Sequence, residues 1–453
     1  MFLYWLTFLC LLQVTHQEED GSVFTFTNNI LSLENKKSED IEKIEILECS
    51  VSTSHNPPIF DKTIIKQINL KNHNFTAIKE NTFDGFQNLK SLKLDSNQIE
   101  TIPENLFENV PSLETLSLKY NQIEKFTPIS RSLLTLSLSS NKITTITNGM
   151  FSKTPNMLIL NLEYNNIMEI EPLALQAMNH LKVLKLNHNK LQSLPKDLFV
   201  NCLEIVNLHL ENNDLKSISD TFAPLVNLVT INLENNQIEE IESNAFLTLE
   251  ALSEMDLSNN SIVQLQDDLF KNLKQLGALK LQNNLIKSLP DNIFKNLQIL
   301  GRLLLNGNKI TSLQANVFSG LTGLRNLNLG HNAITLLQKG SFAGLDKCYD
   351  LDLRYNDLTV LKSGVFSGVS ELEQLRLNGN ELKEIESGAF QGLGKLYALD
   401  LKHTGVQDFT NLKELSNLRI LELNGTKFEN DDDVKIGDNV FHLNQHGNWV
   451  INK

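Results

Sequence analysis

The sequence offers few residues that could carry out catalysis. It contains no H-E-x-x-H, G-x-S-x-G, P-loop, C-x-x-C or dinucleotide-binding motif. Its only G-x-G, Gly392 to Gly394, continues into Lys395 and Leu396 without a third glycine. The ten histidines are scattered, and none are paired at a spacing that suits a metal ion. The sequence therefore predicts a protein that is not an enzyme and that has no cofactor and no metal site.

Residues that could instead bind a partner fall into two groups. Tyr and Arg, which are enriched at binding hot spots, occur together with acidic side chains between residues 350 and 402. We predict this mixed-charge cluster as the ligand-binding site: Asp350, Asp352, Arg354, Tyr355, Arg376, Asp400 and Lys402. The secondary candidate, here called the ring group, is Tyr120, Tyr164, His188 and His209. Between the two groups, Glu211, Glu234, Glu254 and Asp256 form an acidic stretch.

A repeat of 24 residues determines where these side chains lie. Segments of the form L-x-x-L-x-L-x-x-N-x-I recur along the chain, for example Leu276, Leu279, Leu281, Asn284 and Ile286. His73 fills the Asn slot before the series, Thr404 and Thr426 fill it after, and Cys49 fills the first slot of all. Of the 16 intervals between these 17 slots, 13 are 24 residues long, and the others are 20, 23 and 22. The Asn slots are 97, 121, 141, 165, 189, 213, 236, 260, 284, 308, 332, 356 and 380.

The repeat predicts a solenoid of short parallel strands. In L-x-L the two leucines point inward and the intervening residue points outward, as the alternation of a β-strand requires. The Asn follows the strand, where backbone groups lose their ladder partners. Because its amide both donates and accepts hydrogen bonds, a stack of Asn side chains can satisfy those groups from turn to turn. A helical array would need apolar residues at every third or fourth position throughout, which these segments lack.

The phenylalanines form a second column. Twelve of the 23 Phe residues lie ten residues (once nine) after the Asn slot, so we expect a buried aromatic stack on the side opposite the strands. The 20-residue interval lacks this Phe, which predicts a narrower coil between Tyr120 and Asn141. The 22-residue interval, with Leu412 and Leu415, predicts a shorter or more helical segment.

These motifs resemble the leucine-rich-repeat family in its 24-residue extracellular form, over residues 41–428. The chain is similar to Toll-type receptor ectodomains and to secreted and adhesion repeat proteins of insects. The resemblance implies an α/β solenoid, a horseshoe of about 17 repeats. Its parallel sheet would line the concave face, with short irregular or 3-10 segments on the convex face.

The ends of the solenoid need covers, because an exposed terminal turn leaves its strand edge and core open. We assign residues 1–16 to a signal peptide, 17–40 to an N-terminal cap and 429–453 to a C-terminal cap or tail. Phe24, Phe26, Asn29 and Leu31 match a degenerate capping strand. At the other end, we expect Phe441, Leu443 and Trp449 to cover the last repeat.

The cysteines do not form the paired caps that extracellular members of this family usually carry. After the expected signal peptide only Cys49, Cys202 and Cys348 remain. All three occupy inward positions of repeats that are too far apart for a disulfide. The sequence therefore predicts three buried free thiols and no intrachain disulfide.

Charge and the N-terminus indicate where the protein acts. The net charge of −14 argues against nucleic acid and anionic membranes as partners. The apolar run Phe2–Leu12 is shorter than the roughly 20 residues of a membrane span and suits a secretory signal, and no later stretch resembles a span. Beside a signal peptide, the sequons at Asn74, Asn259 and Asn424 become candidate glycosylation sites. We expect a secreted, extracellular protein.

Two functions fit these features. Seventeen strands about 4.8 Å apart, with outward residues spanning about 10 Å, give a face on the order of 800 Å². This area suits a protein or polysaccharide ligand better than a metabolite. The leading hypothesis is a secreted recognition protein of innate immunity or cell adhesion. The alternative is a structural or extracellular-matrix protein that associates with its own kind, as a homodimer or a filament.

Overall fold

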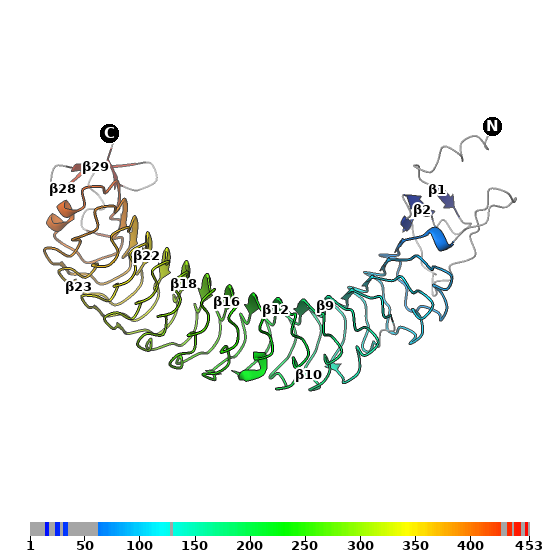
Figure 1. The fold of residues 1–453 in the computed structure, drawn as a ribbon. Helices are drawn as coiled ribbons and strands as arrows, with labels where there is room; N and C mark the ends of the chain where they lie inside the picture. Colours follow the sequence, from blue (N-terminus) through cyan, green and yellow to red (C-terminus); the bar gives the residue numbers. More distant parts are fainter. Residues whose placement is uncertain are drawn as a thin grey trace. The chain divides into compact units, whose positions relative to one another are not determined.

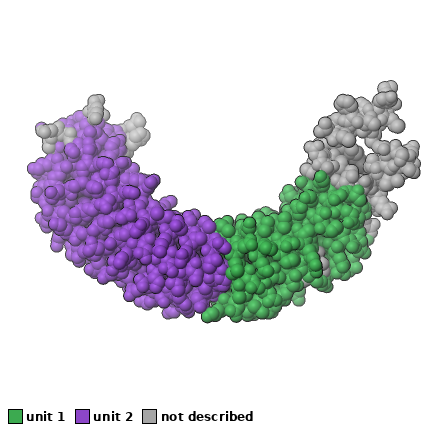
Figure 2. Space-filling model, viewed as in Figure 1, with its two compact units in different colours: residues 1–214 green, residues 215–453 purple. Residues whose placement is uncertain are grey.

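The computed structural model (Figure 1) describes residues 14–17, 23–27, 30–34, 62–126, 130–426, 433–436, 439–444 and 449–451, the first three segments as backbone only. The chain divides into two compact units, Met1–Asp214 and Leu215–Lys453, which Figure 2 draws in two colours. We call them unit 1 and unit 2 and describe each by itself.

Unit 1 is built from seven three-residue strands that follow one another along the coil (Figure 1). Each strand pairs in parallel with the next in uniform register, so that Leu92 lies opposite Leu116 and Leu160 lies opposite Leu184. The central leucine of each pair is buried, as the L-x-L pattern predicts. The strands are β4 (Gln67–Asn69), β5 (Ser91–Lys93), β6 (Thr115–Ser117), β7 (Thr135–Ser137), β9 (Ile159–Asn161), β11 (Val183–Lys185) and β12 (Asn207–His209).

The N-terminal end of unit 1 differs from the expected repeat. Strands β1 (Val14–Gln17), β2 (Val23–Thr27) and β3 (Ile30–Glu34) pair antiparallel in sequence order. β3 then pairs in parallel with β4 and takes the place that the sequence assigns to a strand of the Cys49 turn. Residues 41–51 themselves lie outside the described residues. The expected capping strand at 24–31 is therefore a hairpin, and a short 3-10 helix, η1 (Lys62–Ile64), precedes β4.

Unit 2 contains nine further three-residue strands of the same kind. Together with the seven strands of unit 1, the described residues contain sixteen ladder strands of the repeat, one fewer than the sequence predicts. The strands are β14 (Thr230–Asn232), β16 (Glu254–Asp256), β17 (Ala278–Lys280), β18 (Arg302–Leu304), β20 (Asn326–Asn328), β22 (Asp350–Asp352), β24 (Gln374–Arg376), β26 (Ala398–Asp400) and β27 (Ile420–Glu422).

The C-terminal residues cover the last turn of unit 2. Strands β28 (Asp433–Ile436), β29 (Asn439–Leu443) and β30 (Trp449–Val450) pair antiparallel, and β30 pairs with β27 so that Trp449 lies opposite Leu421. Phe441 and Trp449, two of the three residues expected to cover the last repeat, are fully buried. Leu443 is 42% exposed, so its assignment to the plug is wrong.

The connections between strands contain 3-10 turns and, in the described residues, no α-helix. Helix η2 (Asp220–Phe222) and the longer η3 (Thr410–Glu414) both lie in unit 2. η3 contains Leu412, which confirms the more helical segment predicted for the 22-residue interval. Within the described part of the chain, no helix is long and apolar enough to cross a membrane.

A second set of ladders was not expected. Two-residue parallel strands begin four residues after the Asn slot: β8 (Thr145–Ile146) with β10 (Glu169–Ile170), β13 (Ser217–Ile218) with β15 (Glu240–Ile241), β19 (Ser312–Leu313) with β21 (Leu336–Leu337), and β23 (Val360–Leu361) with β25 (Glu384–Ile385). Nearly equal repeat lengths bring the same extended residues side by side in successive turns. The pattern gave no signal for these pairs, because only one of their two residues is buried.

The stacked asparagines satisfy the backbone as predicted. Asn284 Nδ2 donates to the carbonyl oxygen of Leu281 in its own turn (3.1 Å) and of Leu257 in the previous turn (2.9 Å). Asn284 Oδ1 accepts from the backbone N–H of Ile262 at 3.0 Å. Each amide therefore joins two turns through groups that the strands leave unpaired.

The Phe column forms the predicted stack. All twelve rings are at most 3% exposed, and Phe294 lies 6.4 Å from Phe270 and 6.2 Å from Phe318 between ring centroids. Successive rings are tilted by only 6° and 14° in these two pairs. The stack is core, since burial of each Phe stabilises the fold by about 1.5–3 kcal/mol. The predicted narrowing near Tyr120–Asn141 stays a prediction, because residues 127–129 lie outside the described chain.

Two of the three predicted thiols are confirmed. Cys202 and Cys348 are free and fully buried. Burial raises the pKa of each thiol to about 12, so both stay protonated at neutral pH. Cys49 lies outside the described residues.

Candidate binding surface on the strand face

Each turn presents four side chains on the face of the sheet. In the turn of β22 these are Asp350, Asp352, Arg354 and Tyr355, because Leu351 and Leu353 point into the core. The last of the four immediately precedes the ladder residue. We call the fourth position of every turn the edge column.

The edge column has a left-handed backbone. In unit 1 its φ is positive at Asn72, Ser96, Tyr120, Ser140, Tyr164, His188 and Asn212, and in unit 2 at Asn235, Asn259, Asn283, Gly307, His331, Tyr355, Gly379, His403 and Gly425. The left-handed conformation suits Gly and Asn, whereas another residue pays roughly 1–2 kcal/mol. Tyr or His in this column therefore costs stability that Asn or Gly would not, and such retained strain points to a function.

The mixed-charge cluster predicted from the sequence comes together on three consecutive turns of unit 2. Strand pairing places Asp352 opposite Arg376 and Arg376 opposite Asp400. Arg376 forms an ion pair with Asp350 on β22 and donates to Gln374 Oε1 at 2.9 Å. Its guanidinium thus spans two turns and is held at both ends.

The other charges of the cluster are also paired. Arg354 Nε lies 3.0 Å from Asp352 Oδ2, and the backbone N–H of Arg354 donates to Asp352 Oδ1 at 3.1 Å. Lys402 forms an ion pair with Glu422 on β27, and its backbone N–H donates to Asp400 Oδ1 at 2.9 Å. The hydrogen bond with Glu422 raises the pKa of Lys402. Burial raises the pKa values of Asp352 and Asp400, since it removes water from their charged forms.

Tyr355 is the aromatic member of the cluster. It is 46% exposed, and its ring stacks on His331 of the preceding turn at 4.5 Å between centroids. A Cβ on Gly379, in the following turn, would lie 2.4 Å from the Tyr355 ring, so only glycine leaves room for the ring there. The contact with His331 thus fixes the Tyr355 ring, and Gly379 leaves space for it.

The structure adds residues that the sequence reading missed. Asn326 Nδ2 donates to Asp350 Oδ2 at 2.7 Å, while His331, Gln374 and Glu422 contact Tyr355, Arg376 and Lys402 as described above. Each of these four residues occupies the same outward column as a predicted residue and lies one turn away from it. A comparison of whole columns, rather than of single turns, would have found them.

The ring group does not form one cluster. Tyr164 and His188 stack face to face at 4.0 Å between centroids, with the two planes tilted by 9°. Tyr120 lies two turns before Tyr164 in the edge column, and His209 lies on β12 in an inner column with its Nδ1 3.6 Å from Glu211 Oε1. The structure therefore confirms one contact of the group and separates the other two members.

The acidic stretch is less acidic than the sequence suggests. In unit 2, Lys280 on β17 reaches back to β16 and lies 3.0 Å from Glu254 and 3.1 Å from Asp256. Burial opposes the charge of Lys280, but hydrogen bonds with both carboxylates raise its pKa. Within the described residues, no group of three or more His, Cys, Asp or Glu side chains could hold a metal ion.

The sequons differ in accessibility. Asn74 is exposed, whereas Asn259 is half-buried and its amide already bonds to Glu234 Oε1 at 3.0 Å and to Asn283 at 2.8 Å. Asn424 is half-buried, and the Thr426 hydroxyl of its sequon donates to the carbonyl oxygen of Leu423 at 2.6 Å. Glycosylation of all three remains a prediction, with Asn74 the best placed.

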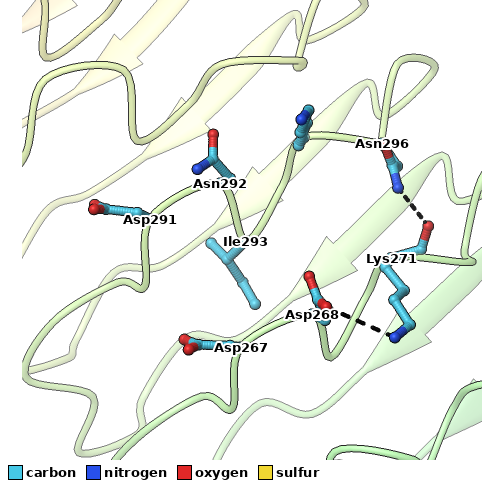
Figure 3. Close-up of a pocket in the computed structure, with 8 residues that line it drawn as sticks. Asp267, Asp268, Lys271, Asp291, Asn292, Ile293 and Asn296 are labelled. Carbon is cyan, nitrogen blue, oxygen red and sulfur yellow. Dashed lines mark hydrogen bonds and ion pairs between the residues drawn. The ribbon is translucent and has the colours of Figure 1, made fainter.

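A shallow cleft of about 390 Å³ lies between two neighbouring connections of unit 2, away from the outward strand columns (Figure 3). In Figure 3, Asp267 and Asp268 lie on one connection, and Asp291 and Asn292 lie on the next. Lys271 lies 3.7 Å from Asp268, and its carbonyl oxygen accepts from Asn296 at 2.8 Å. No residue of either predicted group lines this cleft.

Comparisons with solved structures support the architecture. A leucine-rich-repeat protein of Leptospira interrogans is 24% identical, with a TM-score of 0.64 over 80% of this chain and 90% of that chain. Toll in the Drosophila Toll–Spatzle complex is 19% identical, with a TM-score of 0.58 over 80% of this chain and 65% of that chain. The matching chain in the glycosylated form of that complex is 20% identical, with a TM-score of 0.67 over 90% of this chain and 57% of that chain. The chain thus spans less than two thirds of the two Toll chains, and these likenesses establish the fold alone.

The family follows from the sequence itself. No curated protein gives a significant match to this chain. The model of the leucine-rich repeat matches in ten stretches, one over residues 65–123 and nine overlapping ones that together cover residues 131–406. This is most of the chain, and it coincides with the ladder strands and the stacked asparagines. The chain belongs to the leucine-rich-repeat family.

Proposed function

We propose that this chain is a secreted recognition protein that binds a protein ligand through the mixed-charge cluster of unit 2, without catalysis. The observation that carries the proposal is the assembly of all seven predicted residues on three consecutive turns. Tyr and Arg, the residue types of binding hot spots, lie at the centre of the cluster. A Drosophila relative in fold, Toll, is known in complex with Spatzle, which supports a protein as the ligand class.

The cluster is suited to binding because it is already ordered. Arg354 and Arg376 are held by carboxylates, so little side-chain entropy is lost when a partner docks. Both guanidinium groups remain partly exposed, at 41% and 33% of the side chain. A partner with its own mixture of charges would exchange ion pairs with the cluster, which favours specificity over raw affinity.

The test compares two double variants of equal charge. In Arg354→Glu/Arg376→Glu the cluster loses both of its arginines, and we expect binding of a captured extracellular partner to be lost. In Arg302→Glu/Arg325→Glu the same charge change falls on exposed arginines of β18 and the adjoining turn, and binding should persist. Circular dichroism should show that both variants stay folded, but the first should melt at a lower temperature, because the buried carboxylate of Asp352 loses its cation. Retention of the partner by the first variant would refute this site.

The biological setting is part of the same proposal. An exported chain with the exposed sequon Asn74 and a preformed binding face fits a role in innate immunity or cell adhesion. The alternative, a matrix protein that associates edge to edge, requires an open strand edge. β30 pairs with β27 and so covers that edge over Ile420 and Leu421. This pairing disfavours the matrix-protein alternative. Light scattering of the purified chain separates the two, since self-assembly predicts a dimer or filament and recognition predicts a monomer.

A further inference from the structure

The turn of β7 in unit 1 carries shorter side chains at its last two outward positions than either neighbouring turn does. Its four outward side chains are all short and carry hydroxyl groups: Thr135, Ser137, Ser139 and Ser140. The preceding turn places Lys119 and Tyr120 at the two last outward positions, and the following turn places Glu163 and Tyr164 there. We call this feature the serine trough, with the β7 turn as its floor and the two tyrosines as its walls.

The walls of the trough are exposed and rigidly attached. Tyr120 and Tyr164 are 62% and 53% exposed, the highest values among the tyrosines of the described residues. The backbone N–H of Tyr120 donates to the carbonyl oxygen of Ser139 at 3.0 Å, and that of Ser140 donates to Glu163 at 3.0 Å. His188 backs the Tyr164 ring at 4.0 Å. Because the two tyrosines are two turns apart, their backbones are separated by about 10 Å.

The floor retains unused hydrogen-bonding capacity. Ser137 is 94% buried, and its Oγ has no hydrogen-bond partner. The polar side chains on either side of Ser137 already have hydrogen-bond partners. Ser117 donates to Asp95, and Asn161 Nδ2 donates to Glu163 Oε1 at 2.8 Å. A buried hydroxyl without a partner costs free energy that a bound polar group can recover.

One acidic side chain, Glu163, and one basic side chain, Lys119, lie beside the trough. Burial opposes the charge of Glu163, but hydrogen bonds from Asn161 and Asn187 and the charges of Lys185 and Lys119 lower its pKa overall. Glu163 therefore remains an anionic acceptor at neutral pH, and Lys119 on the opposite side is a cationic donor. One charge of each sign favours a neutral ligand with both donors and acceptors.

The geometry points to a sugar ring of a neutral polysaccharide as the occupant of the serine trough. A pyranose ring has apolar C–H faces that can stack on tyrosine rings, and hydroxyl groups at its rim that can pair with serine, lysine and glutamate. The spacing of the walls accommodates one such ring between them. The strained backbone of Tyr120 and Tyr164, with φ of 56° and 55°, is then the cost of placing the walls. The site lies entirely in unit 1, so it can fail or succeed independently of the protein-binding cluster.

Saturation-transfer NMR and calorimetry on the full secreted chain test this site. The probes are three neutral hexasaccharides: a β-1,4-linked N-acetylglucosamine oligomer, a β-1,3-glucan oligomer and a mannose oligomer. We expect at least one to bind, and Tyr120→Ala or Tyr164→Ala to weaken its binding about tenfold. Ser137→His should also abolish binding by filling the floor. It should not disturb the fold, because β12 carries His209 in the same column.

The matched control is Tyr397→Ala, which removes an exposed tyrosine of unit 2 and should leave hexasaccharide binding unchanged. Circular dichroism confirms that each variant keeps its fold. Absence of binding by all three hexasaccharides overturns the proposal. So does binding that survives both Tyr120→Ala and Ser137→His in folded protein. A protein ligand that is lost with Ser137→His, in the absence of any hexasaccharide binding, would reassign the trough to a protein surface and would equally overturn it.

Discussion

At the scale of single residues, neighbouring asparagines have different tasks. In Asn283–Asn284 the second amide is 3% exposed and bonds across two turns, whereas the first is exposed and has a φ of 57°. Asn suits both places, because its amide mimics a backbone group and its backbone tolerates the left-handed region. The repeated Asn–Asn pairs thus combine two separate requirements. The sequence reading recognised only the buried one.

The two tasks predict different costs. Asn284→Ala leaves the backbone N–H of Ile262 without a partner and removes one of the two amide donors from the carbonyl oxygens of Leu257 and Leu281, so the free energy of unfolding should fall by about 1–3 kcal/mol. Asn283→Gly keeps the left-handed backbone and removes one exposed hydrogen bond, so it should cost at most about 0.5 kcal/mol. Urea denaturation of both variants measures this. Equal losses of stability in the two variants would show that the buried ladder amide contributes no more to stability than the exposed amide does.

The tyrosines of the edge column predict a stability gain on substitution. Tyr120 is largely exposed and has a left-handed backbone, so Tyr120→Asn removes strain and little packing. The free energy of unfolding should rise by about 0.5–1 kcal/mol, a gain typical where function holds a residue in an unfavourable conformation. Ser140→Asn, one turn away, relieves the same backbone strain at a position without a ring and should raise the free energy of unfolding by a similar amount. A destabilised Tyr120→Asn would mean that the ring packs for stability rather than for binding.

At the scale of elements, the Phe stack is the main support of the side opposite the strands. Phe294→Ala removes a fully buried ring from between two others and should lower the free energy of unfolding by about 3–5 kcal/mol. Phe294→Leu keeps most of the volume, and Leu175 already fills this position of another turn in buried form, so its cost should be below about 2 kcal/mol. Thermal denaturation distinguishes the two. Similar losses for both would show that ring stacking, rather than volume, matters here.

Strands and ladders were predictable because they rest on a local rule repeated many times. L-x-L fixes which side chains are buried, and the Asn slot fixes where the strand ends. The two-residue ladders such as β8–β10 were not predictable, because they arise from alignment between turns rather than from a pattern within one. The candidate site shows the same division. The column positions of Arg354 and Arg376 follow from the repeat, whereas their pairing with Asp352 and Asp350 depends on side-chain conformations that no spacing encodes.

At the scale of the whole molecule, the repeat makes long-range contacts uniform. Between turns, the ladder asparagines bond to residues 18–27 positions earlier, and the Phe rings contact their equivalents one turn away. Stability is therefore close to a sum over turns and the interfaces between them. The ends depend on other devices, β1–β3 before β4 and β30 beside β27. The two thiols of the described residues, Cys202 and Cys348, lie in the core of separate turns.

These thiols predict how the molecule responds to alkaline pH. Cys202 titrates at about 12 in the folded chain against an ordinary value of 9.0, because burial opposes the thiolate. The folded-state pKa is raised, so the thiol's contribution to stability is complete below pH 9 and is lost as pH rises from about 9 towards about 12. At pH 10 ionisation of the unfolded thiol should lower the free energy of unfolding by an amount on the order of 1 kcal/mol. Cys202→Ala should remove that part of the pH dependence, measured by urea denaturation at pH 8 and pH 10. A thiol reagent should leave Cys202 and Cys348 unmodified in the native chain at pH 8 and should find three free thiols after unfolding without reductant. A count of one would reveal a disulfide and contradict the inward positions assigned to all three.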